Sequence, residues 1–276
     1  MRTFLTQMVT VFDLGFLVYL LAINSLCLVF SVVAYFRLVN HRRRWTVREL
    51  DAVMRSPATP AISIIVPGFN EEATIVESVR SLLALNYPQF EVIVINDGST
   101  DGTLMSLIEA YGLISAPVSY AHHLPTQPIR GIYRSLATHD VVVIDKVNGG
   151  KADAINAGIS AAQFPLVCVI DADSLLEEHA LVRVVLPFIE DPDTIAAGGI
   201  VRIANGCGID HGRVTDVRLS DRWLVRFQVV EYLRTFLAGR VTLSALNALL
   251  IISGAFGVFR RDVLLDAGET HRTPPK

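Results

Sequence analysis

Two aspartates separated by one alanine, Asp171 and Asp173, are the most chemically suggestive group in this chain. They directly follow Leu166–Ile170, a continuous apolar run of the length expected for a strand buried on both faces. Because residues two apart in an extended chain project to the same side, we expect both carboxylates to point together from the end of that strand. Open α/β sheets bind ligands at the carboxyl ends of their strands, and carboxylate oxygens suit a hard divalent cation. The pair therefore predicts a metal site.

A lysine ahead of this strand strengthens the interpretation. The glycines at 149–150 predict a turn, and a helix is expected over about 151–162, beginning with Lys151. A cation in the first turn opposes the helix dipole, but it is useful where an anion binds. A diphosphate held by the N–H groups of the helix terminus, Lys151 and a metal would explain all of these features. The simpler alternative is a capping box formed by Ser174 and Glu177, in which the aspartates only mark the start of a helix.

Alternating strand and helix patterns supply the elements that would position these residues. Further apolar runs of strand length occupy 61–66, 90–95 and 141–144. Apolar residues recur at helical spacing from Ile75 to Leu83, and a second helix is expected to end near Tyr111. This order predicts an α/β fold with a largely parallel, Rossmann-like sheet and helices on its faces.

Polar residues also follow the first two predicted strands. Asn70 comes after the first strand and could cap the next helix, whose positive end suits Glu71. Asp97 comes after the second, where its carboxylate could accept hydrogen bonds from a uracil or a ribose, or could serve only as a turn residue. A dinucleotide-binding Rossmann domain is the natural alternative, but no Gly-x-Gly-x-x-Gly follows the first strand.

The N-terminal region predicts a membrane anchor. The segment Leu14–Phe36 has no charged residue and is long enough to span a bilayer. A cleaved signal peptide is the alternative, but Arg2 is the only basic residue before the segment, and the apolar run exceeds a typical signal. Arginines follow the segment instead, at positions Arg37, Arg42, Arg43, Arg44, Arg48 and Arg55. The positive-inside rule then places residues 1–13 outside the cell and the remainder in the cytoplasm, at the plasma membrane.

The charge of the chain argues against a nucleic-acid partner. The formal net charge is −3, and basic side chains beside anionic lipid headgroups account for the arginine cluster better than nucleic acid does. The aromatic residues of Arg222–Arg240 fit either a helix lying on the bilayer surface or ordinary core packing.

Taken together, the motifs resemble those of the family 2 glycosyltransferases, which have the GT-A fold, over about residues 61–268. The matching stretches are Val66–Glu72, Asn96–Ser99, Asn148–Ala152 with Asn156, and Asp171–Asp173. Asn96 replaces the first acid of the family's Asp-Asp-Gly-Ser loop. The resemblance implies a UDP-sugar donor bound by Pro67, Asn70, Glu71, Asp97, Lys151, Asn156 and Asp171. It also implies that Asp171 and Asp173 bind Mg²⁺ or Mn²⁺.

The apolar N-terminal segment and Gln228–Arg234 narrow the resemblance to the membrane-bound processive synthases of β-linked polysaccharides, most closely those of poly-β-1,6-N-acetylglucosamine. Ser253–Arg261 resembles their acceptor-facing loop, so Gly254 and Arg260 are expected on the acceptor side. The implied reaction is an inverting transfer of N-acetylglucosamine from UDP-N-acetylglucosamine to a growing glycan. Transfer of a single sugar to a lipid carrier is the alternative.

The general base of this family lies in a Glu-Asp motif shortly after the acceptor loop, and none follows Asp266–Gly268. We therefore expect no catalytic base here, an atypical tail and a truncated C-terminus, which leaves a non-catalytic nucleotide-sugar-binding fragment as a further alternative. The expected organisation is an N-terminus over 1–13, a transmembrane helix over 14–36, a basic linker over 37–60, a donor-binding domain over 61–215, an incomplete acceptor-side and interfacial segment over 216–268, and the tail over 269–276.

Overall fold

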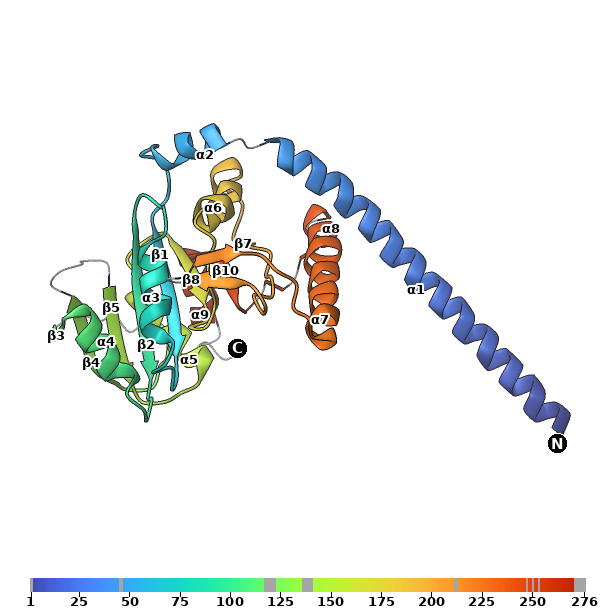
Figure 1. Ribbon diagram of the computed structural model, residues 1–276, viewed down its shortest axis with the longest axis horizontal. Coiled ribbons are helices and arrows are strands. Elements are labelled where there is room, and N and C mark those ends of the chain that lie inside the picture. Colours follow the sequence, from blue (N-terminus) through green and yellow to red (C-terminus); the bar gives the residue numbers. More distant parts are fainter. Residues whose placement is uncertain are drawn as a thin grey trace. The chain divides into compact units, whose positions relative to one another are not determined.

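The computed structural model describes residues 2–44, 47–116, 123–135, 141–210, 213–246, 248–249, 251–252 and 254–270. The chain divides into two compact units (Figure 1). The first consists of Met1–Thr46 and Ser220–Ile251, and the second of Val47–Leu219 and Ile252–Lys276. Ser253 of the expected acceptor loop and residues 271–276 of the expected tail lie outside the described residues.

The second unit is built on a sheet that has eight strands within the described residues, in the order β3-β4-β5-β2-β1-β6-β10-β7. The strands are β1 (Ile62–Gly68), β2 (Phe90–Asp97), β3 (Leu113–Ser115), β4 (Ile129–Ser135), β5 (Val141–Lys146), β6 (Leu166–Ile170), β7 (Ala196–Gly198) and β10 (Phe256–Arg260). A separate hairpin pairs β8 (Gly208–Asp210) with β9 (Arg213–Asp216). The central strands β5, β2, β1 and β6 are parallel, whereas β4 and β10 run antiparallel to their neighbours. The expected α/β sheet is confirmed, with antiparallel strands added on both sides.

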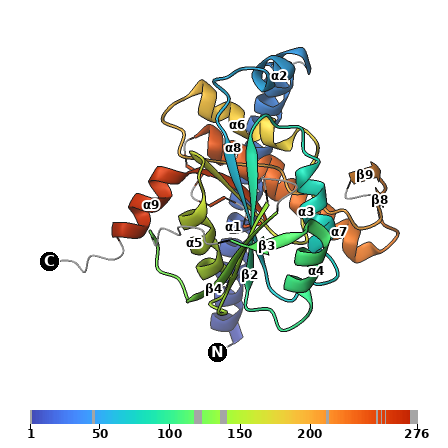
Figure 2. The same cartoon turned by 90° about the vertical axis from the view of Figure 1, so that its left-hand side faces the viewer.

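Helices cover both faces of this sheet. The helices of this unit are α2 (Val47–Met54), α3 (Ile75–Leu83), α4 (Thr103–Tyr111), α5 (Lys151–Ala161), α6 (Ala180–Glu190) and α9 (Arg261–Thr270). Figure 2 shows α3 and α4 on one face, and α5 and α9 on the other. One local expectation was wrong: Asn70 does not cap α3, because a turn intervenes and Thr74 stands at the N-cap. The expected linker over 37–60 contains α2.

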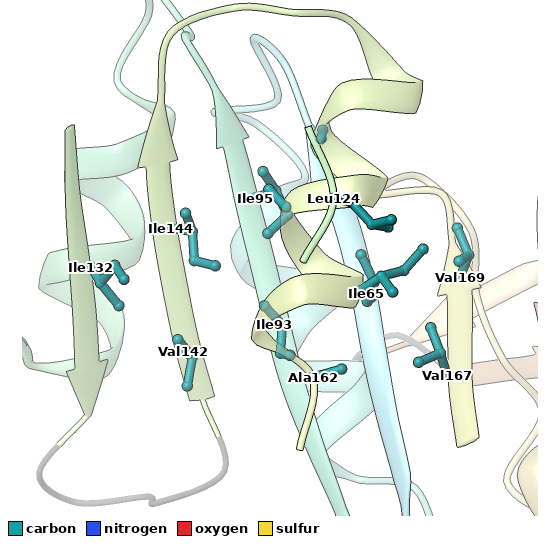
Figure 3. Close-up of a cluster of buried hydrophobic side chains, with 13 residues drawn as sticks. Ile65, Ile93, Ile95, Leu124, Ile132, Val142, Ile144, Ala162, Val167 and Val169 are labelled. Carbon is teal, nitrogen blue, oxygen red and sulfur yellow. The ribbon is translucent and has the colours of Figure 1, made fainter. Parts of the chain in front are cut away.

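A core of buried aliphatic side chains fixes α5 against the sheet (Figure 3). Ile65 of β1, Ile93 and Ile95 of β2, and Val167 of β6 point toward the helix, which contributes both alanines and isoleucines to the same cluster. At Gly158 an added Cβ would lie 2.5 Å from Ile65 Cγ2, so the helix backbone approaches the strand closely. Each fully buried Val or Ile side chain contributes about 1.5–3 kcal/mol of transfer free energy. This packing holds the N-terminus of α5 at the carboxyl edge of the sheet.

The first unit consists of helices. These are α1 (Arg2–Arg44), α7 (Trp223–Leu233), the π-helical turn η1 (Arg234–Arg240) and α8 (Val241–Ala245). In the part of the chain that the structure describes, one helix is long and apolar enough to cross a membrane by length and composition, over Thr6–Asn40. The helix is longer than the expected span because the chain stays helical through Asp13.

Residues of α8 and η1 pack on α1 within this unit. The Thr242 hydroxyl donates to the Phe30 carbonyl oxygen over 2.8 Å, and Phe236 is buried. By contrast, Trp223 and Phe227 of α7 are largely exposed. Within Arg222–Arg240, η1 is therefore packed and α7 presents its aromatic side chains outward, and a position of this segment on the bilayer surface stays a prediction.

Candidate active site

The carboxyl edge of the sheet has a break in strand order beside β1. From β1 the chain moves outward through β2 to β5, and it then returns to place β6 on the other side of β1. The segments that follow β1 and β6 therefore leave the sheet in different directions. Open α/β sheets bind ligands in the crevice at such a position. This is where the sequence predicted the chemistry.

Lys151 and Asp171 meet at this edge. The Lys151 ammonium forms an ion pair with the Asp171 carboxylate and lies 3.3 Å from the Gly254 carbonyl oxygen. The side chains of the pair are 50% and 32% exposed, respectively, so both are open to solvent. Gly254 precedes β10, whose first residue, Phe256, is paired with Ile170 at the end of β6. Three segments distant in sequence thus converge on one cation.

Asp171 and Asp173 lie in a turn, and not in the extended chain that we expected. Strand β6 ends at Ile170, and Asp171–Ser174 forms a turn in which the Ser174 N–H donates to the Asp171 carbonyl oxygen over 3.0 Å. The argument from alternating side chains in extended chain is therefore wrong here. What remains is a pair of accessible carboxylates at a turn that follows a buried strand.

This donor set suits a metal that takes most of its ligands from elsewhere. Among the described residues, no group of three or more His, Cys, Asp or Glu side chains could hold a metal ion. Mg²⁺ is commonly bound by one or two carboxylates together with water and substrate phosphates, and Asp171 and Asp173 could supply those two. The ion pair with Lys151 shows that the Asp171 carboxylate already accepts positive charge. The metal site itself stays a prediction.

Asp97 is held by several protein partners. It is 3% exposed, and its carboxylate accepts N–H bonds from Gly149 over 3.0 Å and from Gly150 over 2.8 Å. Its Oδ1 also lies 2.5 Å from the ammonium of Lys146, and its main-chain carbonyl accepts a 2.7 Å bond from Asn148 Nδ2. Asp97 therefore anchors the turn before α5. Contact between this carboxylate and a donor nucleoside remains a prediction.

The segments that follow β1 and β2 are joined by reciprocal hydrogen bonds. Asn70, at φ 58°, accepts a 2.9 Å bond from the Thr100 N–H on its side-chain oxygen, and its own N–H donates to Ser99 Oγ over 3.0 Å. The Glu71 N–H donates to Thr103 Oγ1 over 2.9 Å, and the same hydroxyl lowers the pKa of Asp101 by donating to its carboxylate. Asn70 therefore stiffens the rim of the crevice, which is a different role from capping a helix.

Other predicted site residues are less directly placed. Pro67 lies within β1, in register with Ile95, and the Glu71 carboxylate accepts a 2.7 Å bond from the Thr74 hydroxyl. Asn156 donates to the Pro125 carbonyl oxygen over 3.3 Å. The donor-binding roles of all three are untested by these contacts.

Arg260 does not lie beside Gly254, because residues 256–260 form a strand instead of a loop. Its register partner is Leu166, at the opposite end of β6 from Ile170. Four residues of strand place it roughly 14 Å from the crevice edge. There its guanidinium bonds Asp262 and the Pro192 carbonyl oxygen, and that pairing lowers the pKa of Asp262. The expected acceptor-side position of Arg260 is corrected, while Gly254 is placed at the crevice.

Sequence reasoning missed two buried polar groups beside the crevice. Lys146 is 0% exposed at the end of β5, and Asn96 Nδ2 donates to Asp145 Oδ1 over 2.7 Å. The Asn96 side-chain oxygen is buried and has no hydrogen-bond partner among the described residues. The only available signal was the polar pair Asp145-Lys146 immediately after an apolar run, which does not reveal the strand pairing.

Comparisons with known proteins agree with the family resemblance seen in the sequence motifs. The model of the family described as "Glycosyl transferase family 2" matches residues 63–122, and the model described as "Glycosyltransferase like family 2" matches residues 126–275. The poly-beta-1,6-N-acetyl-D-glucosamine synthase of Staphylococcus epidermidis is 30% identical over 208 residues, which cover 75% of this chain and 41% of that protein. The corresponding synthase of Staphylococcus aureus (strain COL) is 27% identical with the same coverage. The chain thus spans less than half the length of these curated relatives.

Solved structures give weaker matches. The mannosyltransferase PcManGT from Pyrobaculum calidifontis, in complex with GDP-Man and Mn²⁺, has a TM-score of 0.49 and 17% identity over 88% of this chain and 57% of that chain. Staphylococcus aureus TarS 1-349 has a TM-score of 0.45 and 20% identity over 75% and 49%, respectively. The family match rests on the sequence, since the second family model alone covers more than half of the residues, and by that match the chain belongs to the family 2 glycosyltransferases.

Proposed function

We propose that this chain acts as a membrane-anchored glycosyltransferase. It transfers N-acetylglucosamine from UDP-N-acetylglucosamine to a growing β-linked polysaccharide, with inversion and with the help of Mg²⁺ or Mn²⁺. The observation that carries the proposal is the meeting of Lys151 and Asp171 at the crevice beside β1. The sugar and the polymer are suggested by the names of the Staphylococcus relatives.

The chemistry required of the chain is mainly electrostatic. In the transfer, an acceptor hydroxyl oxygen bonds to the anomeric carbon while the bond from that carbon to the diphosphate oxygen breaks on the opposite face. In this proposal the Lys151 ammonium, which lies beside Asp171, offsets the negative charge that develops on the departing diphosphate. A divalent cation on Asp171 and Asp173 would offset the same charge. The hydroxyl proton passes to a general base, a role that we assign to none of the described residues.

The donor and metal roles are tested together by calorimetry of UDP binding with and without Mn²⁺. We expect Mn²⁺ to strengthen UDP binding to the parent chain but not to Asp173→Ala, because that variant loses one of two carboxylate ligands. Glu109→Ala is the matched control, since it removes an exposed acid on α4 away from the crevice. UDP affinity that is the same with and without metal in all three proteins would refute the metal role.

The length of the product separates the polysaccharide synthase from its alternative. Membranes that contain the chain are incubated with radiolabelled UDP-N-acetylglucosamine, and the products are separated by size and by extraction into organic solvent. A glycan of many residues supports the proposed activity. A single labelled sugar on an extractable lipid would instead support transfer to a lipid carrier.

We also propose that α1 anchors the chain in the plasma membrane with residues 37–276 in the cytoplasm. The support is the apolar stretch Thr6–Asn40 together with the arginines on its C-terminal side. Tags at each end, tested for protease access in intact cells, check this orientation. Cleavage of a C-terminal tag from outside the cell would contradict it.

A further inference from the structure

Lys146 is a fully buried cation that the proposed chemistry does not use. It ends β5 and is paired in register with Asp97 at the end of β2. Its ammonium lies 2.5 Å from Asp97 Oδ1 and 2.7 Å from the Val147 carbonyl oxygen, and it also forms an ion pair with Asp153 of α5. These three acceptors match the three N–H donors of a lysine. An isolated ammonium in this position would cost several kcal/mol, so the partners explain how it is accommodated.

The two carboxylates that Lys146 neutralises hold the turn before α5 from opposite sides. Asp97 accepts the N–H groups of Gly149 and Gly150. Asp153 accepts a 2.9 Å bond from the Gln127 N–H, and an added Cβ at Gly149 would lie 2.5 Å from its carboxylate carbon. The backbone of the turn is therefore confined between Asp97 of β2 and Asp153 of the helix.

Lys151 is the next residue after this turn. Gly150 reaches it with φ 86°, a conformation that side chains disfavour, so the direction in which the helix starts depends on the turn being held. The Lys151 ammonium then reaches Asp171 and the Gly254 carbonyl oxygen at the crevice. A shift of the turn would move that ammonium relative to Asp171.

We infer that Lys146 is a positioning residue for nucleoside diphosphate binding. It balances the charges of Asp97 and Asp153, and so fixes the turn that aims Lys151 into the crevice. Without the ammonium, the buried Asp97 carboxylate and the partly buried Asp153 carboxylate would face each other across the turn with no cation between them, and their repulsion would push the turn apart. Lys146 itself touches no nucleotide-sugar donor, because its side chain is fully enclosed. This inference rests on the proposed function, since it assumes that Lys151 meets a diphosphate.

The test compares the full chain in detergent with Lys146→Met, Asp153→Asn and the double variant. Each protein is measured for UDP affinity in Mn²⁺ by calorimetry and for melting temperature by circular dichroism. We expect Lys146→Met to weaken UDP binding at least 10-fold at a temperature where the protein is folded. The double variant should bind at least as tightly as Lys146→Met, because removing one carboxylate relieves the repulsion. Additive losses in the double variant would overturn the inference, as would UDP affinity in Lys146→Met within twofold of the parent.

A purely structural role is separated from positioning by a matched variant at the opposite edge of the sheet. There the buried Ser63 hydroxyl donates to Glu91 over 2.6 Å and accepts from the Phe164 N–H. Ser63→Ala should lower the melting temperature and leave UDP affinity unchanged. For each variant, the loss of UDP affinity is compared with the fall in melting temperature. If the ratio of these two losses is the same for Ser63→Ala and Lys146→Met, the positioning role is refuted.

Asp153→Asn and the parent chain cover the two remaining outcomes, a Lys146→Met variant that does not fold and a parent chain that does not bind UDP. Should Lys146→Met fail to fold, Asp153→Asn carries the test, because it retains the Lys146–Asp97 pair and an oxygen acceptor for Gln127. We then expect a threefold to tenfold loss of UDP affinity in a folded protein, and unaltered affinity would overturn the inference. A parent chain that does not bind UDP would instead refute the proposed function, which is a distinguishable outcome.

Discussion

Replacement of Gly98 by alanine gives a sharp test of how the crevice is held together. Gly98 follows β2 with φ 70°, and an added Cβ would lie 2.6 Å from the Asn148 main-chain nitrogen. That nitrogen belongs to the turn leading to Lys151 and cannot move without moving the turn. Gly112, at the end of α4, provides the matched control. It has a similar φ of 56°, yet an added Cβ would meet no atom of the described residues within 4 Å.

The expected magnitudes follow from this difference. A left-handed conformation costs an alanine roughly 1–2 kcal/mol, and this strain applies to both variants. Overpacking adds about 1–3 kcal/mol at Gly98 only, because its clash is with backbone. For a unit of this size, 1 kcal/mol shifts the melting temperature by roughly 2–4 °C. Gly112→Ala should therefore melt roughly 2–8 °C below the parent, and Gly98→Ala should melt several degrees lower again.

Both variants are measured by thermal denaturation and by UDP calorimetry in Mn²⁺. Because the clash pushes on the turn before α5, Gly98→Ala should also weaken UDP binding in the folded protein, whereas Gly112→Ala should bind UDP as the parent does. Equal melting temperatures and equal UDP affinities in the two variants would refute the reasoning. That result would mean that the turn can move away from β2 at no cost.

Three other predictions concern single side chains. Lys151→Met should bind Mn²⁺ alone at least threefold more tightly, because the Asp171 carboxylate is freed from its ion pair with Lys151. UDP binding should weaken in the same variant. A fall in Mn²⁺ affinity would contradict the view that Lys151 and the metal share the Asp171 carboxylate. Burial raises the pKa of the Cys168 thiol, so at pH 8 this thiol should react with a thiol reagent far more slowly than Cys207 does. Once the chain is denatured, the two thiols should react at similar rates, as followed by mass spectrometry. Asn96→Asp would place a second buried carboxylate beside its hydrogen-bond partner on β5 and raise the pKa of the pair. The variant should be less destabilised at pH 5 than at pH 7, since stability is lost as pH rises through a raised pKa; a melting-temperature loss of the same size at both pH values would argue against that placement.

The central elements could be predicted because their own residues determine them. Leu166–Ile170 is apolar throughout and forms β6 with the expected bounds, and the helix expected from Lys151 begins there. Strands β4 and β10 were missed. The residues of β4 are mixed in polarity, whereas β10 is a short apolar stretch interrupted by Gly257, and both become strands by pairing with β5 and β6. A strand whose main stabilisation is supplied by its neighbours leaves little signal in its own sequence.

Of the candidate site, too, one part could be predicted from the sequence and another part could not. The proximity of Lys151 to Asp171 follows from the ends of adjacent elements, so chain order was sufficient to suggest it. The burial of Lys146 depends on its register opposite Asp97, which is a property of two strands separated by a helix and a hairpin. Arg260 was misplaced for a related reason, since the antiparallel direction of β10 determines which of its ends reaches the crevice.

The late arrival of β10 has a consequence for synthesis of the chain. Strand β6 is paired with β1 on one side, and its other side is completed only by residues 256–260, after the chain has passed through the helices of the first unit. At about 5–20 residues per second, translation of the intervening segment takes roughly 4–17 s. During that interval an apolar edge strand is open to pairing with other chains, which is a recognised route to aggregation. The yield of folded protein should therefore depend on how quickly ribosomes traverse residues 171–255, and slow codons in that stretch should lower it.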